Sequence, residues 1–202
     1  MTTSATDVIG AGLGTGIVAV VVIFVFVMVM AVPFIATSAQ SPSATTRRAA
    51  TIGCACAYAG ALVAYTVLPL PTSESMQRRC EGEGDAVKAQ LTPFHFLTQS
   101  GESTGLALIN PGLAWQVVLN VALFMPLGAI IILGLRRSAV VAVAVAFVCS
   151  LVIEASQLTG LWFIYDCAYR VFDVDDILAN TLGAGLGAAI ALRWRARAKL
   201  SE

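Results

Sequence analysis

The chain has 202 residues, of which 58% are hydrophobic and only 12% are charged. Soluble domains carry roughly 45–50% apolar and about 25% charged residues, so this composition excludes an ordinary soluble enzyme. Twelve basic and twelve acidic residues give a net charge of zero, which argues against a nucleic-acid partner. Uncharged runs from Val8 to Thr46, Ala49 to Ser73 and Ser103 to Leu135 each exceed the ~20 residues that cross a bilayer. The sequence therefore predicts an integral membrane protein.

Hydropathy predicts an all-α, polytopic helix bundle, because membrane lipid leaves unpaired backbone groups without partners. About five transmembrane helices are expected, at Ile17–Ala36, Ala49–Leu70, Pro111–Leu135, Ser138–Gly160 and Asp176–Trp194. The first of these lacks a basic leader and a convincing cleavage motif, so we interpret it as an uncleaved anchor.

The charged residues of the loops predict the orientation of these spans. The loops after the first, third and fifth spans hold eight basic residues and one acidic residue, whereas the opposite side holds four basic and ten acidic residues. Because Arg and Lys accumulate in cytoplasmic loops, the N-terminus is expected outside and the C-terminus in the cytoplasm. Two extracytoplasmic loops follow, Pro71–Asn110 and Leu161–Asp175.

The two extracytoplasmic loops carry a cysteine each and a group of aromatic residues. Cys80 and Cys167 are a candidate disulfide, because both lie on the side of the membrane where disulfides persist. The second loop is rich in aromatic rings, which we interpret as anchors at the membrane interface. These rings belong to Trp162, Phe163, Tyr165 and Tyr169.

Polar residues inside the predicted spans are the strongest functional signal. Glu154 lies about 9 Å below the outer surface, counting back along its helix at ~1.5 Å per residue, and Gln157 shares its face. An acidic residue at such depth usually faces the bundle interior or a water-filled cavity. Asn120 and Asn180 reach similar depths on two other spans. We hypothesise that these side chains converge on an outward-facing polar site; the alternative is that Glu154 only fixes helix packing.

Three aspartates, Asp173, Asp175 and Asp176, open the last span, and Arg170 lies close enough to offset part of their charge. Aspartates commonly cap helix N-termini, but one cap would suffice and neighbouring carboxylates repel each other. The cluster could therefore bind a divalent cation, a cationic ligand or, through Arg170, a phosphate. Capping and ligand binding both stay open at this point.

These motifs resemble the VanZ-like family of bacterial membrane proteins. The resemblance rests on four blocks after Leu91, which together span about half the chain. They are Thr92-Pro93-Phe94, an Asn-x-x-Leu-Phe-x-Pro-Leu-Gly block from Asn120, the Glu154-x-x-Gln157 pair, and an Arg-x-x-Asp-x-Asp-Asp-x-x-x-Asn block from Arg170. The chain then divides into an N-terminal two-helix region with the start of a loop (1–91), a VanZ-like membrane region (92–195) and a cytoplasmic tail (196–202).

The resemblance implies a multi-pass protein of the bacterial cell membrane, and the family's namesake is associated with resistance to teicoplanin-type glycopeptide antibiotics. It names no reaction. Carried over motif by motif, it selects as ligand-binding candidates the same residues that depth and charge select. These are Asn120, Glu154, Gln157, Arg170, Asp173, Asp175, Asp176 and Asn180.

Three hypotheses of function follow. In the first, the site binds an amphiphile, either a lipid-tailed glycopeptide or a lipid-linked envelope ligand, with its tail among the helices and membrane lipid. In the second, the protein is an intramembrane enzyme in which Glu154 and Asp176 are the catalytic candidates and a cation such as Mg²⁺ binds the aspartates. In the third, it is a structural subunit of a membrane assembly. The sequence favours binding narrowly over catalysis, and it does not indicate an oligomeric state.

Overall fold

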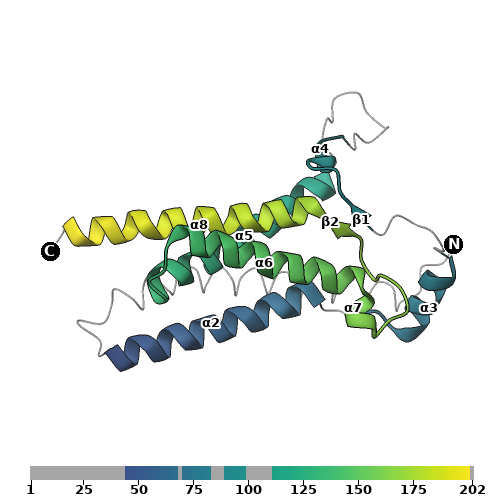
Figure 1. The fold of residues 1–202 in the computed structure, drawn as a ribbon, viewed down its shortest axis with the longest axis horizontal. Coiled ribbons are helices and arrows are strands. Elements are labelled where there is room, and N and C mark those ends of the chain that lie inside the picture. Colours follow the sequence, from purple (N-terminus) through teal and green to yellow (C-terminus); the bar gives the residue numbers. More distant parts are fainter. Residues whose placement is uncertain (1–43, 68–69, 83–88, 99–110, 201–202) are drawn as a thin grey trace. The chain divides into compact units, whose positions relative to one another are not determined.

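The chain is mostly helical, with short loops and one small pair of strands between the helices (Figure 1). The computed structural model describes residues 44–67, 70–82, 89–98 and 111–200. The chain divides into two compact units, Met1–Leu70 and Pro71–Glu202.

In the first unit the structure describes helix α2 (Ala44–Val67). It covers most of the second predicted span and begins earlier, at Ala44. Its apolar part, Thr51–Thr66, is shorter than the ~20 residues that typically cross a hydrocarbon core. The first predicted span, Ile17–Ala36, lies outside the described residues. The count of five spans therefore stays a prediction.

The second unit contains three helices that are long and apolar enough to cross a membrane. The first joins α5 (Pro111–Ala129) to a π-helical turn, η1 (Ile130–Gly134). The others are α6 (Ala139–Leu158) and α8 (Val174–Leu200). They correspond to the last three predicted spans, although α8 begins earlier and ends later than expected. The described part of the chain thus has the helices of a membrane protein.

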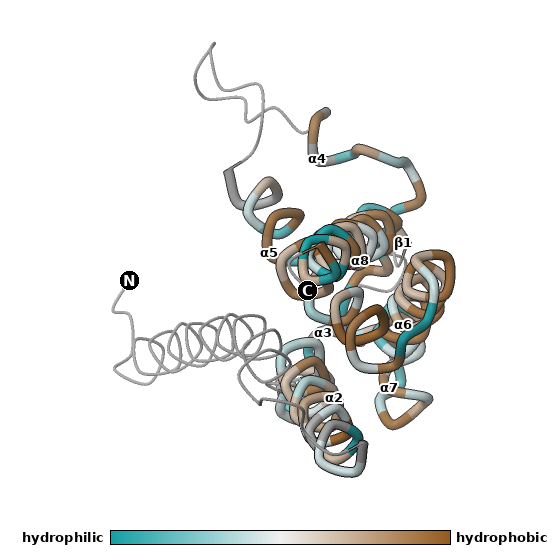
Figure 2. Tube along the Cα trace, turned by 90° about the vertical axis from the view of Figure 1, so that its left-hand side faces the viewer, coloured by the Kyte–Doolittle hydropathy of each residue, from teal (hydrophilic) through white to brown (hydrophobic). Residues whose placement is uncertain are grey.

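Glycines bring α5 and α8 into backbone contact. The two helices run in the same direction and lie side by side with α6, which runs the opposite way (Figures 1 and 2). A Cβ atom added at Gly183 would overlap the carbonyl oxygen of Val121, and one added at Gly187 would overlap that of Met125. Gly128 of α5 meets the α8 backbone in the same way. Small residues are typical of helix–helix interfaces in membranes, where close packing rather than the hydrophobic effect joins the helices.

Small residues line most of the buried faces of α6 and α8, whereas α5 and η1 contribute larger buried side chains such as Phe124 and Ile132. Buried positions on α6 and α8 include Ala142 and Ala188, both fully covered. Exposed positions include Val140, Phe147 and Leu182, and Figure 2 shows apolar colouring along all three helices. In water this arrangement would be costly, but lipid tails are as apolar as these side chains. We therefore expect the outer faces of α6 and α8 to contact acyl chains.

Two short strands depart from the expected all-α fold. β1 (Ala89–Gln90) and β2 (Phe172–Asp173) pair in parallel, with Ala89 opposite Phe172 and Gln90 opposite Asp173. Together with helix α4 (His95–Thr98) they lie at the end of the helix group where α8 begins (Figure 1). The pairing gives backbone partners to the segments that lead into α4 and α8. A two-residue ladder carries no sequence periodicity, so the hydropathy pattern does not reveal it.

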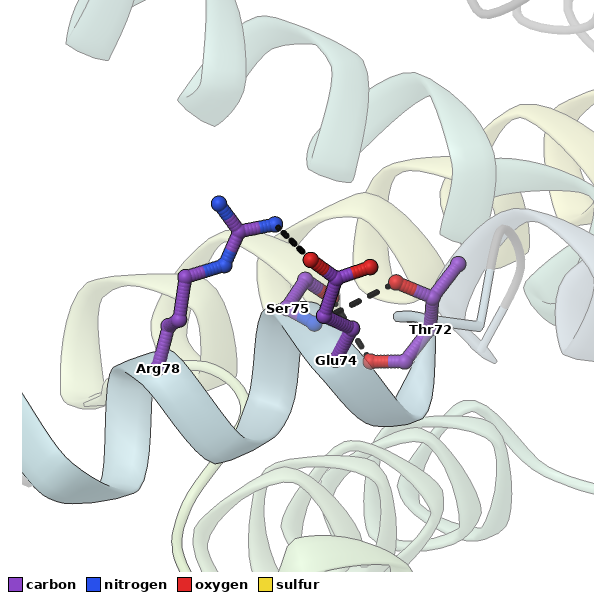
Figure 3. Close-up of polar contacts among 4 residues, drawn as sticks. All are labelled: Thr72, Glu74, Ser75 and Arg78. Carbon is purple, nitrogen blue, oxygen red and sulfur yellow. Dashed lines mark hydrogen bonds and ion pairs between the residues drawn. The ribbon is translucent and has the colours of Figure 1, made fainter.

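Helix α3 (Ser73–Gly82) begins with a local capping motif (Figure 3). Thr72 Oγ1 accepts the backbone N–H of Ser75 at 3.3 Å, and Ser75 Oγ donates to the Thr72 carbonyl oxygen at 2.8 Å. Arg78 forms an ion pair with Glu74 at 3.2 Å on the exposed side of the helix. Exposed pairs of this kind contribute about 0–1 kcal/mol, so the cap matters more than the ion pair for where α3 starts.

A disulfide joins α3 to the chain that follows α6. It links Cys80 to Cys167, which lies between helix α7 (Gly160–Phe163) and β2, with the two Cα atoms 5.6 Å apart. The two cysteines are 87 residues apart in sequence. A link between such distant positions restricts the unfolded chain and holds the polar segment that precedes α8.

The glycine contact predicts a loss of stability for one of two neighbouring substitutions and little change for the other. Gly183→Ala places a methyl group against the α5 backbone and should lower the free energy of unfolding by about 1–3 kcal/mol. Gly185→Ala is the matched control, because a Cβ atom there meets only the Val143 Cγ2 atom, at 3.8 Å. Thermal unfolding in detergent measures both. Equal stability of the two variants would contradict the proposed role of the α5–α8 contact.

Candidate functional site

Two amides of α5 hold the carboxylate of Asp176 in the first turn of α8. Asn120 Nδ2 donates to Asp176 Oδ1 at 2.6 Å, and Gln116 Nε2 lies 3.0 and 3.1 Å from Oδ1 and Oδ2. Gln116 and Asn120 are one helical turn apart and therefore share a face of α5. Asn120 is buried, Asp176 is half-buried and Gln116 is exposed, so the group runs from the helix interface toward the surface.

Glu154 links α6 to the segment that enters α8. Its side chain is only 2% exposed, and its Oε2 accepts the backbone N–H of Asp173 at 2.8 Å. A buried carboxyl needs hydrogen-bond partners to offset its desolvation, and this N–H supplies one. Glu154 and Asp176 are also close enough to interact electrostatically. Glu154 thus holds the segment that enters α8, and this bond fits both a packing role and a functional role.

The other two aspartates accept hydrogen bonds from backbone groups. Asp173 Oδ1 accepts the N–H of Asp175 at 2.9 Å, which is the bond of a helix N-cap. Asp175 Oδ1 accepts the N–H of Phe94 at 2.6 Å, across 81 positions of sequence. The Thr92-Pro93-Phe94 block is therefore joined to the start of α8 by a carboxylate. Asp173 caps the helix, and Asp175 joins it to the loop.

The three aspartates thus turn toward different partners. Within the residues that the structure describes, no group of three or more His, Cys, Asp or Glu side chains is placed to hold a metal ion. The divalent-cation alternative at Asp173, Asp175 and Asp176 therefore gains no support from these residues.

A second polar layer lies one helical turn deeper, between α6 and α8. Asn180 Nδ2 donates to Ser150 Oγ at 2.8 Å, and both residues are buried. Asn180 lies four positions after Asp176 and shares its face of α8. Ser150 lies four positions before Glu154 and shares its face of α6. The Asn180 Oδ1 atom is buried without a hydrogen-bond partner. Asn120, Glu154 and Asn180 therefore line one end of the interface without bonding to one another directly.

The segment before β2 covers the end of α6. Tyr169 donates its backbone N–H to the carbonyl oxygen of Gln157 at 3.3 Å, and both residues are buried. The Tyr169 ring lies 6.3 Å from that of Tyr165, and its hydroxyl is buried without a partner. Tyr165 donates its hydroxyl to the carbonyl oxygen of Pro71 at 3.1 Å. Tyr169 is thus buried and Tyr165 is partly buried, and the expectation that these rings anchor the chain at the membrane interface stays a prediction.

Arg170 is the exposed cation of the site. Its guanidinium lies within electrostatic range of the Glu154 and Asp176 carboxyl groups and of the Tyr169 hydroxyl. Within the described part of the chain it makes no ion pair at 4.0 Å or less. Its exposed charge therefore lies near carboxyl groups that are buried or half-buried.

Two groups of the site outside the membrane-spanning helices have shifted pKa values. Burial raises the pKa of the Asp173 carboxyl, and the nearby Asp175 adds to this, while the N–H of Asp175 and the charge of His95 act in the opposite direction. Burial likewise raises the pKa of the Tyr169 hydroxyl. Tyr169 is therefore a neutral donor at physiological pH.

The sequence did not single out Gln116 or Ser150, and it did not indicate that Tyr169 is buried against the end of α6. Gln116 and Ser150 carried a usable signal, since each lies four residues before a selected residue on the same helix, Asn120 and Glu154. Polar residues repeated at helical spacing in an apolar span indicate a shared polar face. Tyr169 carried no such signal, because an irregular segment determines where its ring points.

Three apolar helices that present buried polar residues at one end define a helical membrane protein. The VanZ/LLP1 family matches residues 55–195, a stretch that includes every polar residue of the site, and the chain belongs to this family. The match confirms the resemblance that the sequence motifs indicated. No curated protein and no solved structure matches the chain significantly.

The raised pKa of Asp173 predicts a pH-dependent stability. A carboxyl whose folded-state pKa is raised stabilises the fold below its unfolded pKa of about 3.9, and this contribution is lost as the pH rises through the folded value. Asp173→Asn keeps an oxygen acceptor for the Asp175 N–H but cannot ionise. The melting temperature of the wild type should therefore fall more than that of the variant as the pH is raised from about 4. Parallel curves in a detergent melting series would contradict this assignment.

Proposed function

We propose that this protein binds the polar head of an amphiphilic ligand of the bacterial cell envelope at the start of α8. The observation that carries the proposal is the exposed Arg170, which lies within electrostatic range of the Glu154 and Asp176 carboxyl groups. These groups lie at one end of an otherwise apolar helix group. Buried charges in apolar helices are costly and usually serve a function. A lipid-tailed glycopeptide or a lipid-linked envelope precursor has the polar head and the apolar tail that such a place would accept.

The arrangement assigns different roles to the candidate residues. Arg170 and Asp176 are the groups that meet the ligand head, because Arg170 is exposed and Asp176 is half-buried. Asn120 and Gln116 orient the Asp176 carboxylate, whereas Glu154 holds β2 through the Asp173 N–H. A head with both donors and acceptors would bind best, because it can pair with the guanidinium and the carboxylate at once.

The proposed site faces outward from the cell. The start of α8 is acidic, whereas Arg136 and Arg137 lie at the opposite end of the helix group, as does the basic end of α8, Arg193–Lys199. Arginine-rich ends favour the cytoplasm, so the acidic end would lie outside, in a multi-pass protein with its C-terminus inside. A site on that side can meet glycopeptides and envelope precursors.

The intramembrane enzyme is the second candidate, and the burial of Glu154 in an apolar helix is the observation that favours it. Glu154→Gln separates the two candidates. The amide retains an oxygen to accept the Asp173 N–H but cannot act as a general acid or base. Retained ligand binding with unchanged envelope lipids would count against catalysis, whereas folded protein with altered envelope lipids would favour it.

The binding proposal predicts a selective loss of affinity in purified protein. Arg170→Gln and Asp176→Asn should each weaken teicoplanin binding at least about tenfold, which is ~1.4 kcal/mol, because each removes a charge-assisted contact. Arg78→Gln is the matched control, since Arg78 makes only an exposed ion pair with Glu74 on α3. Vancomycin, which lacks the lipid tail, should bind more weakly than teicoplanin. Binding can be measured by titration in detergent.

The same variants test a link to antibiotic resistance. A susceptible host that expresses the wild type should be protected against teicoplanin more than against vancomycin, and the Arg170→Gln and Asp176→Asn variants should lose this protection at matched expression. Unchanged binding in both variants would contradict the proposed site. Absence of any binding or protection by the wild type would favour a structural subunit of a membrane assembly.

A further inference from the structure

The chain makes a left-handed turn immediately after α6, in the segment labelled α7. Four successive residues have positive φ angles: 61° at Gly160, 57° at Leu161, 58° at Trp162 and 69° at Phe163. Three of these four are not glycine, although left-handed backbone is unfavourable for residues that carry a Cβ atom. A run of this kind persists only where the surrounding structure holds it in place.

Contacts on both sides of the turn hold it. Thr159 Oγ1 accepts the Trp162 N–H at 3.2 Å, and the Thr159 carbonyl oxygen accepts the Phe163 N–H at 2.8 Å. The Gly160 carbonyl oxygen accepts the Tyr165 N–H at 2.9 Å. A Cβ atom at Gly160 would collide with the carbonyl oxygens of Tyr165 and Cys167, so the following chain crosses directly over it. The disulfide at Cys167 then fixes that chain to α3.

The turn displays three large apolar side chains. Trp162 is 59% exposed, Phe163 is 82% exposed and Ile164 is 76% exposed. They follow the apolar outer face of α6 after a break of a few residues, and no charged residue occurs between Glu154 and Asp166. The apolar character of α6 therefore extends into the turn without an intervening charge.

We propose that this turn inserts Trp162, Phe163 and Ile164 into the boundary between the lipid head groups and the acyl chains of the bilayer. Lipid is the occupant that fits, because the turn continues a lipid-facing helix and lies where that helix ends. Aromatic side chains favour this boundary, and a turn already held by hydrogen bonds and a disulfide need not rearrange when it inserts. The turn would also set the depth of α6, and with it the depth of Glu154, which lies about one helical turn from its end.

The proposal does not depend on the identity of any ligand and can be tested with tryptophan fluorescence. The chain has three tryptophans, so the double substitution Trp115→Phe and Trp194→Phe leaves Trp162 as the reporter. The full chain is reconstituted in phosphatidylcholine vesicles whose acyl chains are brominated either near the head group or near the methyl end. Iodide in the aqueous phase is the opposing quencher.

Bromine near the head group should reduce Trp162 emission by about half or more, as expected for a ring inserted ~5–10 Å into the boundary. Bromine near the methyl end and iodide should have little effect. Quenching by iodide without quenching by bromine would place the turn in water and overturn the proposal. Protection from both quenchers would overturn it as well, because another protein segment would then cover the turn.

A second variant tests whether the apolar side chains of the turn are needed for its insertion. Phe163→Ser and Ile164→Ser, added together to the single-tryptophan protein, remove apolar surface without altering the backbone that follows Gly160. The proposal expects bromine quenching of Trp162 to fall and iodide quenching to rise. The matched control carries Leu182→Ser on the outer face of α8, which is 57% exposed and distant in sequence from the turn. Equal quenching in both variants would contradict insertion by the turn.

Discussion

The close approach of α5 and α8 is the constraint on which the rest of the structure depends. Gly183 and Gly187 let the α8 backbone meet that of α5 directly. At this separation Asn120 reaches the carboxylate of Asp176. The packing that joins two apolar helices and the hydrogen bonds to a half-buried carboxylate therefore depend on the same contact. In lipid, where the hydrophobic effect does not join helices, such a contact is the main source of specificity.

In the proposed function the site has two roles: its carboxylates hold the local structure together, and some of the same residues meet a ligand. Carboxylates at the end of apolar helices must be hydrogen-bonded, and the structure satisfies them with backbone N–H groups and amides. The same bonds hold β2, the Phe94 loop and the first turn of α8 together. Structural and ligand-binding roles therefore share residues, and the exposed Arg170 is the group least committed to internal bonds.

Several features followed from the sequence, the helices from hydropathy and the family from the motif blocks. The three long apolar helices of the second unit and the membership of the VanZ/LLP1 family agree with the spans and motifs read from the chain. The short strands β1 and β2 and the burial of Tyr169 did not follow. Those features depend on where irregular segments turn, and hydropathy carries no information about the direction of a loop side chain.

The sequence by itself determined that this is an apolar helical membrane chain, because the length and composition of each run set its preference for lipid. It also determined which polar residues interrupt those runs. Only the tertiary structure decided their partners: Asn120 and Gln116 for Asp176, the Asp173 N–H for Glu154, and Ser150 for Asn180. The physical reason is that helical spacing determines which residues share a face, whereas the rotation and separation of packed helices determine what that face meets.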